Sequence, residues 1–144
     1  MNISGGTNET WLEARANTEL TVTGGSIGNH LSAWGNSTVN ISGGSIGDYL
    51  DADEDSEVTI FGTGFNFGYG VYADGDLLDE ATLTGTHSDG TAFNNPVKID
   101  RSATVTLAAP AAVVPEPSSL AMFGIGALGL FGYGRRRRQT SAAA

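Results

Sequence analysis

The sequence predicts an all-β protein, a parallel β-helix or β-solenoid with nineteen-residue coils, followed by one C-terminal transmembrane helix. Three observations support this prediction. A glycine-rich body repeats with a period of nineteen, apolar and polar residues alternate within each repeat, and the end of the chain contains an uncharged apolar run before four arginines. Self-similarity at a short fixed period indicates coils that stack on one another, so the repeat decides the fold class.

Several positions of the repeat recur together. Equivalent residues are Gly5, Gly24, Gly43 and Gly62; Ile3, Val22, Ile41 and Ile60; Leu12, Leu31 and Leu50; Ala14, Ala33 and Ala52; and the pairs Asn17-Thr18, Asn36-Ser37 and Asp55-Ser56. Alternating apolar residues indicate short strands with one buried face, while glycine pairs and Asn/Asp-Ser/Thr pairs favour corners. We therefore expect three short strands and three corners per coil, with equivalent residues stacked about 4.8 Å apart.

The repeat loosens after residue 62. Val71-Tyr72-Ala73 aligns with Leu50-Asp51-Ala52 after two extra residues, and Ala81 to Gly85 aligns with Val58 to Gly62 after four. Residues 85–107, including Val97-Lys98-Ile99, are expected to form an irregular last coil and cap. The predicted organisation is a solenoid over 1–107, an Ala/Pro linker over 108–114, a sorting signal over 115–138 and a disordered tail over 139–144.

The first residues show no sign of a secretory leader. Met1 is followed by neither a basic nor an apolar segment, and it already occupies an inward position of a coil. A solenoid needs a cap at each end, and an uncovered edge invites pairing with another chain. We therefore expect the sequence to be the C-terminal part of a longer protein.

Charge is strongly segregated along the chain. Before Pro115 there are 15 acidic residues against Arg15, Lys98 and Arg101, a net charge of −12. Because such a surface repels phosphate backbones, we expect no nucleic-acid partner. The absence of cysteine excludes thiol catalysis and cysteine metal sites.

An acidic cluster provides weak calcium candidates. These are Asp48, Asp51, Asp53 and Asp55. Calcium prefers six to eight oxygen ligands, but the spacing fits neither the EF-hand loop nor the glycine-rich nonapeptide calcium repeat. A solvated corner is the favoured interpretation, so no cofactor is expected.

Aromatic residues recur at one position of the coil. Trp11, His30 and Tyr49 are equivalent and form a predicted outward ladder, with Trp34 on the same strand face. Stacked aromatic rings can hold sugar rings, which makes Trp11, Trp34 and Tyr49 candidate sugar-stacking residues. Aromatic side chains on strands also pack against each other, and this alternative remains open.

Two carboxylates occupy the same position of the repeat and resemble the acid–base pair of a glycosidase in their spacing. Glu13 and Asp51 are equivalent residues two coils apart, roughly 9.6 Å along the axis, which is near the upper end of the separation of an inverting pair. Ser32 lies between them, and Arg15 is the only basic residue near them in phase. We predict no catalytic residues, with a polysaccharide-active enzyme as the less favoured alternative.

The C-terminal segment has the order of a sorting signal. Val114 to Pro117 reads Val-Pro-Glu-Pro, Ser118 to Gly134 carries no charge, and Arg135, Arg136, Arg137 and Arg138 follow. As a helix, the uncharged run 118–134 would reach roughly 26 Å, the lower limit for a bilayer. The arginines would lie on the cytoplasmic side and the body outside.

These residues together resemble the PEP-CTERM sorting domain of Gram-negative bacteria. The resemblance implies that Pro115, Glu116 and Pro117 are recognised by exosortase, a membrane-embedded cysteine protease, with Arg135 to Arg138 as the basic stop. It implies passage through the inner membrane to the cell surface or exterior, commonly near exopolysaccharide. We expect a non-catalytic surface or extracellular-matrix protein, with a carbohydrate-binding module as the main alternative. An ordinary tail anchor is the alternative for the tail itself.

Overall fold

The computed structural model describes residues 1–8 and 10–110, and within these ranges every regular element is a β-strand. The strands are β1 (Asn2–Asn8), β2 (Leu12–Ala14), β3 (Glu19–Ile27), β4 (Leu31–Ala33), β5 (Thr38–Ile46), β6 (Leu50–Ala52), β7 (Glu57–Thr63), β8 (Gly70–Ala73), β9 (Ala81–His87), β10 (Ala92–Ile99) and β11 (Thr104–Ala108). The all-β prediction is confirmed. The predicted transmembrane helix, 118–134, lies outside the described residues, and no helix capable of crossing a membrane occurs within them.

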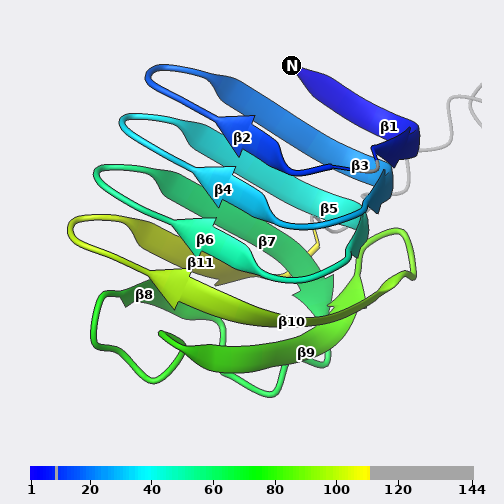
Figure 1. Ribbon diagram of the computed structural model, residues 1–144. Coiled ribbons are helices and arrows are strands. Elements are labelled where there is room, and N and C mark those ends of the chain that lie inside the picture. The colour runs from blue at the N-terminus through cyan, green and yellow to red at the C-terminus, as the bar shows by residue number, and fades with distance from the viewer. Residues whose placement is uncertain (9, 111–144) are drawn as a thin grey trace, which may run out of the picture. The chain divides into compact units, whose positions relative to one another are not determined.

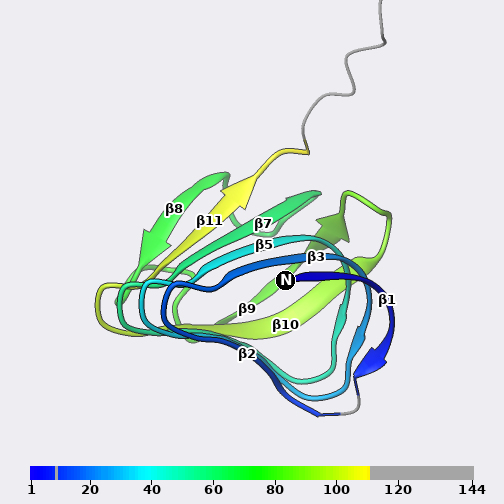
Figure 2. The same ribbon diagram turned by 90° about the horizontal axis from the view of Figure 1, so that it is seen from above.

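Successive coils stack in parallel, and the stacking follows the period of the sequence. The long strands β1, β3, β5 and β7 lie side by side in one layer, and the short strands β2, β4 and β6 lie in another (Figures 1 and 2). Leu20 pairs with Val39, and Leu31 pairs with Leu50, in each case a step of nineteen along the chain. The predicted solenoid and its coil length are therefore confirmed.

The glycine corner differs from the prediction of three separate strands per coil. Instead, β3 and β5 each continue through their glycine pair, and the register with the neighbouring coil shifts there. Gly25 and Gly44 have φ angles of 92° and 90°. A Cβ on Gly44 would lie 2.9 Å from the carbonyl oxygen of Gly25, so the bend accommodates only glycine at this position.

A second corner precedes β3, β5, β7 and β11 and has the same backbone conformation each time. Ala16, Gly35, Glu54 and Arg101 adopt φ angles of 55°, 62°, 59° and 60° in successive coils. Three of these residues are followed directly by the predicted turn pairs, which are Asn17-Thr18, Asn36-Ser37 and Asp55-Ser56. Left-handed conformations in three residues with side chains cost free energy, and the packing of the strands on both sides holds them in place.

The core consists of apolar columns that run across the coils. Their members, all buried, are Leu20, Val39, Val58 and Val105; Val22, Ile41, Ile60 and Leu107; Leu12, Leu31, Leu50 and Val97; and Ala14, Ala33, Ala52 and Ile99. Because like residues meet in neighbouring coils, each column packs similar shapes together and excludes water from the interior. Burial of these columns supplies the main drive for folding.

The predicted continuation of the repeat beyond residue 62 is wrong. Val71 to Ala73 lie in β8, which pairs antiparallel with β11, and Ala81 to Gly85 lie in β9, which pairs antiparallel with β10. The strand that stacks on Leu50 to Ala52 is instead Val97 to Ile99. Likewise β11 stacks on β7. Residues 64–91, between β7 and β10, thus form an insertion within a coil that is larger than a corner loop and contains β8 and β9.

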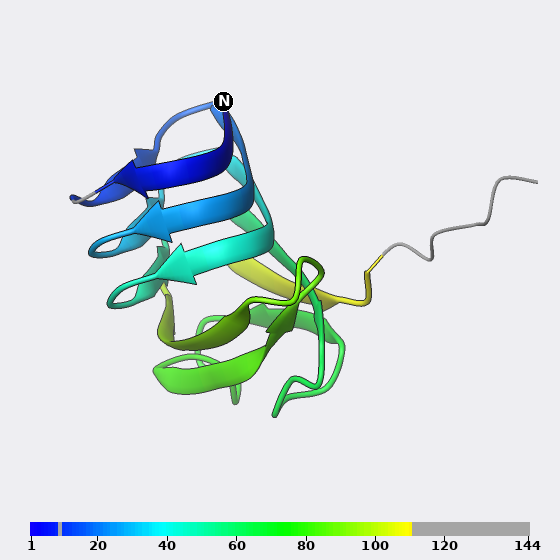
Figure 3. The ribbon, with the colours of Figure 1, turned by 90° about the vertical axis from the view of Figure 1, so that its right-hand side faces the viewer.

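The insertion folds back against the coils that precede it. Figure 3 shows β9 and β10 below the stacked ends of β1, β3 and β5. Asp89, in the β9–β10 turn, accepts a hydrogen bond from the backbone N–H of Gly44 (3.0 Å), and the buried amide of Asn95 donates to the carbonyls of Ile46 (2.9 Å) and Asp48 (2.8 Å). These bonds help to hold β10 beside β6, where it extends the layer formed by β2, β4 and β6.

Replacing Gly47 by alanine tests the closeness of the stacking. A Cβ at Gly47 would overlap the carbonyl oxygen of Gly28 and lie 2.7 Å from its carbonyl carbon, so neighbouring backbones must separate. We expect Gly47→Ala to lower the free energy of unfolding by about 1–3 kcal/mol in urea denaturation. Gly5→Ala is the matched control, since its Cβ would meet no atom within 4 Å. Equal effects of the two substitutions would contradict this packing.

Candidate functional site

Most of the aromatic and charged residues considered as sugar-binding, calcium-binding or catalytic candidates lie at outward positions on or next to β2, β4, β6 and β10. We call this surface the β2–β4–β6–β10 face. Its three columns, in coil order, are Trp11, His30, Tyr49 and Pro96; Glu13, Ser32, Asp51 and Lys98; and Arg15, Trp34, Asp53 and Asp100. The columns exist because parallel in-register pairing places equivalent residues beside one another.

The predicted aromatic ladder is present. The ring of Trp11 meets His30 edge-on at a centroid distance of 5.3 Å, and His30 stacks on Tyr49 at 4.7 Å with an interplanar angle of 11°. One ring face of Tyr49 is therefore covered by His30. Trp11 remains 61% exposed, whereas Trp34 is half-buried in a different column. The three sugar-stacking candidates thus share a face but not a column.

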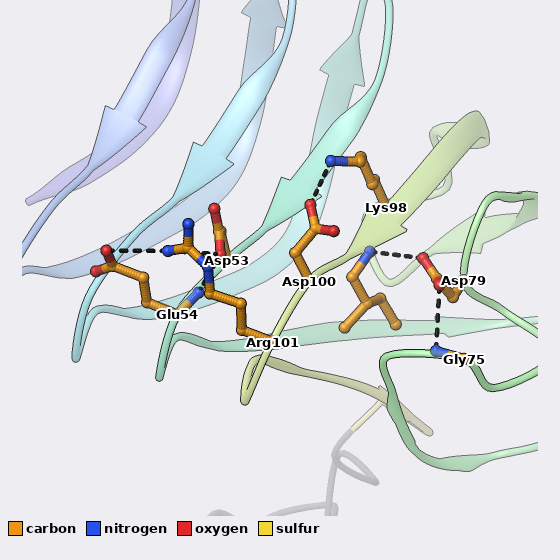
Figure 4. Close-up of polar contacts among 8 residues, drawn as sticks. Asp53, Glu54, Gly75, Asp79, Lys98, Asp100 and Arg101 are labelled. Carbon is orange, nitrogen blue, oxygen red and sulfur yellow. Dashed lines mark hydrogen bonds and ion pairs between the residues drawn. The ribbon is translucent and has the colours of Figure 1, made fainter.

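The four calcium candidates are not gathered into one site. Asp48 and Asp55 are exposed, while Asp53 is buried and accepts a hydrogen bond from the backbone N–H of Glu54 (2.6 Å). Arg101 lies 3.4 Å from the Asp53 carboxylate and 3.3 Å from that of Glu54 (Figure 4). Within residues 1–8 and 10–110, no group of three or more His, Cys, Asp or Glu side chains is arranged to hold a metal ion.

The cations of the face pair with carboxylates in their own coils. Arg15 contacts Glu13 at 2.5 Å, and the Lys98 ammonium contacts Asp100 (Figure 4). The prediction that Arg15 is the only basic residue near the Glu13–Asp51 pair is wrong, because Lys98 stacks directly beside Asp51. The insertion lengthens this coil, so Lys98 lies much more than nineteen residues after Asp51 in the sequence although the two residues are neighbours in the structure.

Asp51 occupies an electrostatically unfavourable position. It is half-buried, and its Oδ1 atom is enclosed without a hydrogen-bond partner. Burial raises the pKa of the Asp51 carboxyl above its ordinary value of 3.8, and the nearby Lys98 charge opposes this shift only in part. Ser32, the neighbour of Asp51 in the preceding coil, is buried and forms part of the floor of the face.

Two hollows open on the face, each beside one aromatic ring. One has a volume of about 380 Å³ and is lined by Arg15, Ala16, Trp34, Gly35 and Glu54. The other has a volume of about 310 Å³ and is lined by Asp48, Tyr49, Glu80, Pro96, Val97 and Lys98. The period of nineteen places neither Glu80 nor Lys98 on this surface, because the first lies in the insertion and the second in the coil after it.

Replacing Asp51 by asparagine tests the electrostatics of the face. A carboxyl whose pKa is raised by folding favours the folded state below its unfolded pKa and disfavours it once pH rises through the folded pKa. Asp51→Asn removes the buried charge, so we expect a higher melting temperature than wild type at pH 7 and a shrinking difference as pH falls towards 3.8. Thermal unfolding at both pH values measures this, with Asp55→Asn at an exposed corner as the control. A gain that persists unchanged in acid would refute the interpretation.

Comparison with known proteins identifies the C-terminal segment. Residues 113–138 match the family model of the PEP-CTERM protein-sorting motif. No curated protein and no solved structure matches the chain. The matched range contains the Pro-Glu-Pro triplet, the uncharged run and the four arginines. The motif implies processing by exosortase and passage through a membrane towards the cell surface. The chain therefore combines a β-solenoid with a C-terminal PEP-CTERM protein-sorting motif.

Proposed function

We propose that this chain is an exported, non-catalytic protein of the cell surface or extracellular matrix, delivered there by its C-terminal motif. The observation that carries the proposal is the motif match over residues 113–138. In this proposal Pro115 to Pro117 are the recognition element for exosortase. Residues 118–134 are a transient anchor, and Arg135 to Arg138 stop transfer on the cytoplasmic side.

The physical chemistry of the tail supports this division of roles. The uncharged run 118–134 can cross a thin bilayer as a helix, and the four adjacent guanidinium groups are too costly to follow it into the hydrocarbon. Cleavage near the Pro-Glu-Pro triplet would separate the body from both parts. The released body would then keep its strongly acidic charge.

The body has properties that suit an extracellular setting. Its net charge of −12 disfavours aggregation and adhesion to anionic lipid headgroups. Without cysteine, its stability is independent of the redox state of the compartment. Antiparallel pairing of β8 with β11 and of β9 with β10 protects the strand edges at one end of the stack.

Pairing of the charged groups on the β2–β4–β6–β10 face supports a non-catalytic role. Glu13 is held by Arg15, and Lys98 is held by Asp100. A glycosidase needs a carboxylate free to act on water or the sugar and a second free to protonate the leaving group. A polysaccharide-active enzyme remains the less favoured alternative, and it requires glycan turnover that Asp51→Asn abolishes.

Carbohydrate binding is the second candidate function. The observation that favours it is the presence of aromatic rings beside two hollows on one face, with charged hydrogen-bonding groups at their margins. Sugar-binding sites need an apolar platform and a few well-placed polar groups, and this face offers both. The two functions are compatible, because sorting depends on the tail and binding depends on the body.

Measuring the C-terminal mass of the chain in the native culture tests the sorting proposal. We expect the released form to end near Pro115 to Ser118 and the membrane fraction to contain some full-length chain with Arg135 to Arg138. Replacing Glu116 by alanine removes the charged centre of the motif and should shift the chain to the uncut membrane form. Glu57→Ala, the same substitution on an exposed strand residue, should leave release unchanged.

A membrane-bound chain that keeps its arginines, with no released form, would contradict exosortase processing. An ordinary tail anchor would then describe the segment, and Glu116→Ala would change nothing. Release of a form cut within the solenoid instead of near Pro115 would equally contradict the proposed role of the motif.

A further inference from the structure

The hollow beside Trp34 adjoins Gly35, which has no side chain, whereas its neighbours in the corner column, Ala16 and Glu54, both do. Gly35 lies between Ala16 and Glu54 in the corner column, and a Cβ on Gly35 would lie 3.6 Å from the Glu54 Oε2 atom. Arg15 binds Glu13 through its Nε (2.8 Å) and a terminal nitrogen (2.5 Å). Arg15, which is paired with Glu13, borders the hollow together with Glu54 and Trp34.

The hollow beside Tyr49 has a parallel composition. His30 covers one face of the Tyr49 ring, and the hollow lies towards Pro96, the next residue in that column. Lys98 supplies a cation at its margin, and Glu80 supplies a carboxylate. Each hollow thus combines one aromatic ring with one cation and at least one carboxylate. The recurrence on a single face indicates one ligand class that engages both.

A pyranose ring matches this combination of groups. Its C–H face is apolar and packs on an aromatic ring, while the hydroxyl groups around its edge both donate and accept hydrogen bonds. Arg15 and Lys98 can donate to such hydroxyls, and Glu54 and Glu80 can accept from them. Because the body carries a net charge of −12, an uncharged sugar is favoured over a uronic acid.

The separation of the hollows sets the length of the ligand. Trp34 follows β4 and Tyr49 precedes β6, so four extended residues and one coil separate them, roughly 14 Å. This span exceeds one pyranose ring. Between the hollows lie Ser32 and Asp51, and Asp51 has an enclosed carboxylate oxygen that lacks a hydrogen-bond partner. A chain of linked sugars would cross these two residues on its way from one ring to the other.

We propose that the β2–β4–β6–β10 face is a binding site for a neutral polysaccharide, with one sugar stacked on Trp34 between Arg15 and Glu54 and another at Tyr49 beside Lys98 and Glu80. This inference deepens the second candidate function and names its site and ligand class. It does not depend on how the tail is processed. Trp11, although the more exposed tryptophan, serves the aromatic ladder and lies outside both hollows.

The test uses the full chain and exploits its two tryptophans. In the Trp11→Phe chain, Trp34 is the only indole, so its fluorescence reports on the hollow directly. The probes are cellohexaose, maltohexaose and xylohexaose, with glucose and hexagalacturonate for comparison. We expect a saturable fluorescence change with at least one neutral hexasaccharide, and binding at least about tenfold weaker for glucose and for hexagalacturonate.

Calorimetry with the same hexasaccharide then assigns the residues. Trp34→Ala should weaken binding about tenfold or more, and the matched control Trp11→Ala should leave it nearly unchanged. Glu54→Ala and Lys98→Ala, at opposite hollows, should each weaken it, and they keep the test valid if Trp34→Ala unfolds. Thermal unfolding of every variant verifies the fold.

Three results would overturn the proposal: no binding of any neutral hexasaccharide, equal losses in Trp11→Ala and Trp34→Ala, or preference for hexagalacturonate. None of these results bears on the C-terminal mass in culture, so failure of the binding site and failure of the sorting proposal are distinguishable.

Discussion

Parallel stacking of equivalent residues in successive coils is the constraint on which the rest of this structure depends. Each coil satisfies its backbone hydrogen bonds through its neighbours, so a residue at one position must tolerate its counterpart about 4.8 Å away. Inside, this places Leu31 against Leu50 and Ala33 against Ala52. Outside, the same rule builds columns of side chains on the β2–β4–β6–β10 face. The core and the candidate site are therefore two sides of the same strands, and a shift of register by one residue would exchange them.

Much of the fold could be predicted because the period of nineteen is regular through the first coils. Alternation identified the inward residues, and the glycine pairs identified a corner, although the chain keeps its strand pairing through that corner. The continuation after residue 62 could not be found from the period alone. One signal was present. Six positions separate Ala52 from Val58 and Ile99 from Val105, whereas eight separate Ala73 from Ala81. The number of residues across the second corner is the same in every coil, and it therefore predicts which strands stack better than the glycine motif does.

At the candidate site, the residues that recur at the period of nineteen could be predicted from the sequence, and the residues that follow the insertion could not. Trp11, His30 and Tyr49 recur at the regular period, so their ladder followed from the sequence. Lys98 reaches its place beside Asp51 only across the insertion, which pairing with β6 reveals. The hollow beside Trp34 includes the small corner residues Ala16 and Gly35, and the hollow beside Tyr49 includes Glu80 from the insertion. The period of the sequence identifies neither hollow. The sorting role proposed for the tail and the sugar-binding role proposed for the body rest on different residues, so each stands or falls on its own.

Both the core and the candidate site depend on the stacking of β10 on β6 and of β11 on β7. Engineered disulfides test this stacking most directly. The chain has no cysteine, so each introduced pair is unambiguous. The structure pairs Thr59 with Thr106 in adjacent parallel strands, whereas continuation of the period after residue 62 would pair Thr59 with Thr82. We expect the chain with Thr59→Cys and Thr106→Cys to form an intramolecular disulfide on oxidation, because the Cα atoms of paired residues in adjacent strands are close enough for a disulfide to join them. The chain with Thr59→Cys and Thr82→Cys should stay reduced. The opposite result would contradict the coil assignment and, with it, the face built on Lys98.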